Sequence, residues 1–157
     1  MSPVTEKDLS RFRDAGFEAP AFGSEHVASD ELWASVLRAV ASPSARLLQA
    51  VYLALQELAE RDDLQELSTE TLDPDAKRLL GYTAARAAED LAESATAKRL
   101  RSLADSLYRP EFSNKNPLTV SSVRTDSYLR ILVERSDEMS RRWNVYGDVS
   151  PHRSAGV

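Results

Sequence analysis

The stretch AVYLAL, residues 50–55, places apolar side chains on every side of any helix that it forms. A helix tolerates such a sequence only where other parts of the protein surround it. The flanks support a helix here, because Ser42 and Pro43 provide a cap and a first-turn proline. We therefore expect a central helix that runs from about residue 43 to Arg61.

Further helices are expected on both sides of this central one. Ser29, followed by two acidic residues, is a good start for a helix that ends near residues 42–43. Asp73 and Pro74 repeat the cap-plus-proline signal and open a long helical region, 74–108. This region forms either one helix or two, with a second start at Ser94 or Thr96. Its alanine-rich stripe predicts close packing against a neighbouring helix.

The pattern predicts an all-α fold, a single-domain helical bundle of about five or six helices with an irregular N-terminal strap. Residues 1–28 are expected to form a short helix over about 6–15 and the strap, 17–28, which mixes Pro, Gly and aromatic residues without periodicity. Residues 29–147 form the bundle, with a loop over 109–117. Gly147 is a plausible helix stop, and 148–157 is expected to be a flexible tail.

Composition is typical of one globular domain. The chain has 157 residues, 42% hydrophobic and 29% charged, and the 42% share is enough for a single core. It contains no cysteine, which excludes disulfides and thiol chemistry. No apolar run approaches the roughly 20 residues that span a bilayer, and the first residues lack a signal-peptide pattern. We expect a cytoplasmic protein that does not bind membranes.

The segment 125–143, TDSYLRILVERSDEMSRRW, predicts a helix with a heptad-like apolar seam. Its apolar positions recur at spacings of 4 and 3, and arginine stems flank them. We expect this seam to face protein, either within the chain or in a second subunit, and the sequence leaves that choice open. The candidate partner-binding residues are Tyr128, Leu132, Arg135, Met139, Arg142 and Trp143.

The charge is distributed unevenly. Residues 1–94 carry 9 Lys or Arg and 18 Asp or Glu, whereas residues 95–157 carry 11 and 7. The basic C-terminal third suggests a nucleic-acid-associated factor as an alternative. Its candidate phosphate-binding residues are Lys98, Arg99, Arg101, Arg109, Lys115 and Arg124. Acidic residues lie among the bases of 125–143, which weighs against this alternative.

Signatures of catalysis are weak throughout. The only histidines, His26 and His152, have no metal-binding spacing, and the acidic groups around residues 60–63 and 73–75 fit helix ends without a metal. No glycine-rich phosphate loop or nucleophile motif is present. We predict no cofactor and favour a noncatalytic helical interaction module, a homodimer or a subunit of a larger assembly. An enzyme with an unrecognised site is the remaining alternative.

Overall fold

The computed structural model describes residues 28–41, 45–64, 66–91, 93–120, 130–131, 133–147 and 149. The predicted short helix over 6–15 and almost all of the strap lie outside these residues. So do Arg124, Tyr128, Leu132 and the two histidines.

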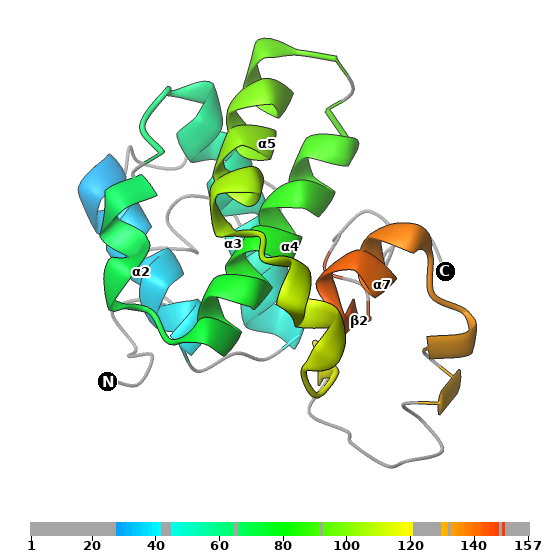
Figure 1. Ribbon diagram of the computed structural model, residues 1–157. Coiled ribbons are helices and arrows are strands. Elements are labelled where there is room, and N and C mark those ends of the chain that lie inside the picture. The colour runs from blue at the N-terminus through cyan, green and yellow to red at the C-terminus, as the bar shows by residue number, and fades with distance from the viewer. Residues whose placement is uncertain are drawn as a thin grey trace.

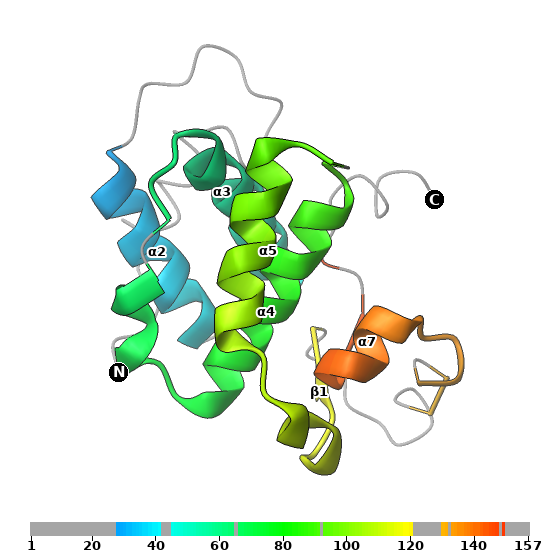
Figure 2. The same cartoon turned by 45° about the horizontal axis from the view of Figure 1, so that its top comes forward.

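The prediction of an all-α fold is confirmed. The described residues form five α-helices, two 3₁₀ helices and one two-stranded sheet (Figures 1 and 2). In chain order these elements are α2 (Ser29–Ala41), α3 (Ala45–Glu60), η1 (Glu66–Thr71), α4 (Pro74–Glu89), α5 (Ala95–Leu107), η2 (Pro110–Asn114), β1 (Leu118–Thr119), α7 (Glu138–Trp143) and β2 (Val145–Tyr146).

The stretch 50–55 lies deep in the core, as its composition predicts. Within α3, only Leu53 of this stretch is more than slightly accessible, and Val51, Tyr52 and Leu55 are fully buried. The most widely connected helix is nevertheless α4 and not α3. It packs on α2, α3, α5, α7 and β2. Within the described part of the chain, no helix is both long and apolar enough to cross a bilayer.

The helical region 74–108 is divided into two helices that run side by side (Figures 1 and 2). Ser94 caps the second helix, α5, since its hydroxyl accepts a hydrogen bond from the amide of Ala97 at 3.0 Å. The apolar stripe of α4 continues to Ala88, whereas Ala95 is exposed. The two helices pack closely because α4 contributes Ala84, Ala87 and Ala88 to the core.

Asp73 caps α4, and its loss is expected to weaken the whole bundle. Its carboxylate accepts a hydrogen bond from the amide of Ala76 at 2.8 Å. We expect Asp73→Ala to lower the free energy of unfolding by about 1 kcal/mol, measured by urea denaturation. Asp73→Ser keeps a capping oxygen and should retain most of the stability. Equal losses in both variants would contradict a capping role.

The helix predicted over 125–143 is not continuous. Arg130, Ile131, Val133 and Glu134 have helical backbone and form what we call the outer turn, but α7 starts anew at Glu138. Asp137 causes the break, because its carboxylate accepts a hydrogen bond from the Ser140 amide at 2.9 Å and so caps a new helix. The 4-3 spacing therefore does not correspond to one continuous helix.

The end of the C-terminal segment also differs from prediction. α7 stops at Asn144, not at Gly147, because Asn144 adopts the left-handed conformation with φ 55°. β2 follows and pairs in parallel with β1, which sequence periodicity did not reveal. Val149, assigned above to the flexible tail, is 1% exposed and belongs to the core.

Candidate functional site

Arg86 is a buried arginine of α4 that holds α7 in place. Its Nη2 donates to Asp137 Oδ1 at 2.6 Å and to Ser140 Oγ at 3.1 Å. Its Nε donates to the hydroxyl of Tyr82 at 3.1 Å, and that hydroxyl donates to the carbonyl of Gly147 at 2.9 Å. Since Asp137 also caps α7, this cluster joins the C-terminal half of α4 to the start of α7.

The Arg86–Asp137 pair is charged at neutral pH. Burial lowers the pKa of Arg86, but hydrogen bonds and charge from Asp137 and Tyr82 outweigh burial and raise that pKa above its ordinary value. The hydrogen bond from Arg86 lowers the pKa of Asp137 from 3.8 to about 2. The pair is therefore a permanent ionic link between the two helices around neutral pH.

Trp143 fixes the other end of α7 against α4. Its side chain is 3% exposed, and a Cβ atom at Gly81 would lie 2.4 Å from its Cζ3 atom. Tyr108 meets the indole edge to face at 5.3 Å between ring centroids, and Phe112 lies at 5.9 Å. The absence of a side chain at Gly81 thus lets a large aromatic ring rest directly on the helix.

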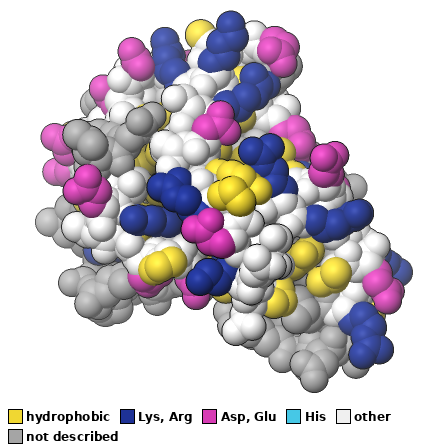
Figure 3. Space-filling view, in the orientation of Figure 1, with side chains coloured by type: hydrophobic (Ala, Val, Ile, Leu, Met, Phe, Trp, Pro, Cys, Tyr) yellow, Lys and Arg dark blue, Asp and Glu magenta, His cyan; other side chains and the backbone are white. Residues whose placement is uncertain are grey.

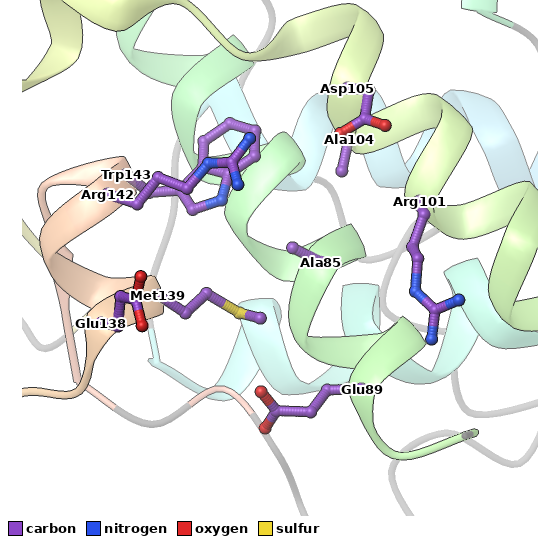
Figure 4. A pocket seen from close by; sticks show the side chains of 9 residues that line it. All are labelled: Ala85, Glu89, Arg101, Ala104, Asp105, Glu138, Met139, Arg142 and Trp143. Atoms are coloured by element: carbon purple, nitrogen blue, oxygen red, sulfur yellow. The ribbon is translucent and has the colours of Figure 1, made fainter. Parts of the chain in front are cut away.

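A groove of about 440 Å³ lies between α4, α5 and α7 (Figure 4). Its apolar residues are Ala85, Ala104, Met139 and Trp143. Figure 4 shows the Met139 side chain reaching from α7 into the space beside Ala85 of α4. The charged residues that line the groove are Glu89, Arg101, Asp105, Glu138 and Arg142. The groove therefore combines an apolar base with charges of both signs.

Some of these charges already interact within the chain. Glu89 lies 3.5 Å from Arg86, and Arg101 lies 3.4 Å from Glu93. The guanidinium of Arg142 lies over the Tyr108 ring, 4.4 Å from its centroid. Figure 3 shows basic and acidic side chains interspersed over the described part of the face in view. The surroundings thus favour a ligand that offers both apolar and charged groups.

The groove unites part of the predicted partner-binding set. Met139 and Arg142 line it and remain accessible, whereas the ring of Trp143 is buried against its own chain. Trp143 is therefore a core residue, and the intrachain alternative holds for it. Arg135 is exposed beyond the groove, after the outer turn. Tyr128 and Leu132 lie outside the described residues.

Within the described part of the chain, the predicted phosphate-binding residues lie in separate places, and Arg124 is outside it. Arg99 turns to the end of α3, where it donates to the carbonyl of Ala59 at 2.9 Å and lies 3.3 Å from Asp62. Arg101 belongs to the groove, and Lys98 is exposed on the same helix. Arg109 and Lys115 line a separate hollow around η2. The other charged residues that line this hollow are Lys77, Glu70 and Glu111.

Sequence reasoning missed the buried arginines of α4. Arg78 is 2% exposed, and its Nη2 donates to the carbonyl of Asn116 at 2.8 Å, while burial lowers its pKa. Arg78, Tyr82 and Arg86 recur every four residues and so share one face of α4 with Ala85 and Glu89. This face covers the C-terminal segment. The regular Arg-Tyr-Arg spacing beside Gly81 is the signal that could have revealed it.

Metal and catalytic chemistry finds no support in this region. In the described ranges, no group of three His, Asp or Glu side chains is placed to hold a metal ion. Acids near residues 60–63 and 73–75 lie at the end of α3 and the start of α4, as predicted.

Comparison with known proteins assigns no family to this chain. No family model matches it, and neither a curated protein nor a solved structure shows significant similarity. The groove between α4, α5 and α7, with the residues that frame it, is therefore the candidate functional site.

Proposed function

We propose that the protein is a noncatalytic helical interaction module that binds a segment of a protein partner in the groove between α4, α5 and α7. The observation that carries this proposal is the apolar base of Ala85, Ala104 and Met139 within a frame of mixed charges. Protein interfaces commonly combine an apolar centre with a polar rim. A side chain inserted beside Met139 would supply the apolar anchor.

The frame of the groove favours binding because it is built before any partner arrives. The Arg86–Asp137 pair fixes the start of α7, and Trp143 fixes its end on Gly81. A preformed groove loses little conformational entropy on binding. Its volume of about 440 Å³ lies within the usual range of binding pockets and suits one or two inserted side chains.

Mixed charge favours protein over a phosphate backbone. The groove is lined by three acids, Glu89, Asp105 and Glu138, and by two bases, Arg101 and Arg142. Affinity for nucleic acid comes from bases that neutralise several phosphates at once. Acids among the bases oppose that effect, whereas a protein segment can supply partners for both signs.

Photo-crosslinking from the groove tests the proposal. A benzophenone amino acid replaces Glu138 at the groove, and in a matched control it replaces Glu60, an exposed glutamate at the end of α3. In extract of the cells that make the protein, we expect a discrete protein crosslink from position 138 and none from position 60. The crosslinked protein is identified by mass spectrometry, and its binding is reconstituted from purified components.

A second substitution assigns the crosslink to the groove itself. Ala85→Glu places a charged side chain in the apolar base and should reduce the position-138 crosslink by at least about tenfold, as loss of one interface anchor does. Crosslinking that is equal from both positions, or that survives Ala85→Glu, would refute the groove as a docking site.

A further inference from the structure

We propose that the partner segment is the outer turn of a second copy of this chain, so that two copies exchange outer turns in a reciprocal homodimer. This inference rests on the proposed function, because it supplies the occupant of the same groove. The outer turn contains Ile131, which is 47% exposed, and Val133, which is 37% exposed. In the described part of the chain, these are the large hydrophobic side chains that face solvent.

Two backbone hydrogen bonds connect the outer turn to the residues that follow it. The amide of Arg135 donates to the carbonyl of Ile131 at 3.1 Å, and the amide of Ser136 donates to that of Val133 at 3.2 Å. The Ser136 hydroxyl also donates to the Val133 carbonyl, at 2.6 Å. These hydrogen bonds hold the segment that carries the exposed side chains of Ile131 and Val133.

The outer turn, taken with the adjacent Arg135, has a charge opposite to that of the groove. Arg130 and Glu134 cancel within the turn, and Arg135, the next residue along the chain, brings the formal charge of these three residues to +1. The groove has three acids and two bases, a formal charge of −1. Association of opposite charges around an apolar contact fixes register and disfavours wrong partners.

The position of the outer turn favours exchange between copies. In both ribbon views it lies on the side of α7 away from α4 and α5 (Figures 1 and 2), and none of its described residues lines the groove of its own chain. Only residues 135–137 separate it from α7, and Asp137 is held by Arg86. Turn and groove are therefore neighbours at one end of the molecule. Two copies related by a two-fold axis can then make the same contact twice.

The test uses purified full-length protein, in sedimentation velocity from roughly 1 to 100 µM, which covers the affinities of weak interfaces. We expect a wild-type dimer. Ile131→Asp damages the turn and Ala85→Glu damages the groove, and each should raise the dimer dissociation constant by more than about tenfold. Thr71→Asp, at an exposed site in η1, is the control that should leave it unchanged.

Mixing the two defective variants gives the sharpest result. A heterodimer of Ile131→Asp and Ala85→Glu retains one intact turn-in-groove contact, whereas each variant alone retains none. We therefore expect the equimolar mixture to recover part of the dimer. Circular dichroism verifies the fold, and Val133→Ser, which removes apolar surface without adding charge, is the second turn variant.

The outcomes separate this inference from the proposed function. A wild-type dimer that resists both variants, or a mixture that recovers no dimer, overturns the inference. A wild-type monomer whose position-138 crosslinker still captures a different, reconstituted protein overturns the inference alone. A monomer that yields no groove crosslink overturns the proposed function as well.

Discussion

Replacement of Trp143 by alanine is expected to lower the free energy of unfolding by about 3–5 kcal/mol, as for other buried large-to-small changes. The side chain is 3% exposed and contacts Tyr108, Phe112 and the surface of α4 at Gly81. Its removal leaves a cavity between α4, α7 and η2 that helices fixed at several points cannot close. Urea denaturation followed by far-ultraviolet circular dichroism measures the loss.

Gly81 provides the internal control for this prediction. In the wild-type protein, Gly81→Ala would bring a methyl group to 2.4 Å from Trp143 Cζ3 and should destabilise the fold. In the Trp143→Ala background the ring is absent, and Leu107 Cβ, at 3.2 Å, is the close contact that remains. The helix preference of alanine over glycine, about 0.5–1 kcal/mol, then offsets part of that contact, so Gly81→Ala should destabilise the fold much less in this background than in the wild type. Equal destabilisation in both backgrounds would show that Gly81 serves another purpose.

The parts of the fold that follow from local chemistry were predictable from sequence. Asp73, Pro74 and Ser94 lie at helix starts because capping depends on residues within one turn. The burial of 50–55 followed from its composition. The prediction of one continuous helix over 125–143 was wrong for an equally local reason. Asp137, three residues before Ser140, offers a competing cap inside a sequence whose apolar spacing still fits one helix.

The groove was only partly predictable, because its frame depends on contacts distant in sequence. Met139 and Arg142 were expected from the apolar seam, but their neighbours across the groove come from α4 and α5. Arg86 meets Asp137 over 51 residues of sequence. Helical periodicity assigns a face to Arg86 and gives no information about what that face will contact. The same holds for Arg101. Its charge led to the prediction of a phosphate-binding role, whereas its position in the fold places it in the groove.

Loss of the Asp137 charge is expected to cost more stability than loss of Arg86. Asp137→Ser retains a capping oxygen but leaves the guanidinium of Arg86, 8% exposed, without its closest carboxylate. Removal of one member of a buried pair costs about 3–5 kcal/mol, and Glu89 at 3.5 Å should keep the loss near the lower end. Arg86→Met leaves Asp137 without its arginine, but this carboxylate is 52% exposed and can bind water instead. The expected loss in free energy of unfolding is therefore only about 1–2 kcal/mol.

The double variant tests whether the two residues act as a pair. Combining Arg86→Met with Asp137→Ser removes the buried charge together with its partner. Its stability, measured by urea denaturation, should therefore be higher than that of Asp137→Ser alone. Strictly additive losses would contradict a direct interaction between the two side chains.

The pH dependence of stability gives an independent measure of the same pair. Folding lowers the pKa of Asp137 from 3.8 to about 2, so the contribution of its charge is complete above pH 3.8 and is lost as the pH falls toward about 2. Without Arg86, the main cause of that lowered pKa is gone. The difference in unfolding free energy between wild type and Arg86→Met should therefore narrow across this interval, as denaturation at a series of pH values would reveal. A difference that stays constant down to pH about 2 would mean that Arg86 stabilises α7 by packing alone.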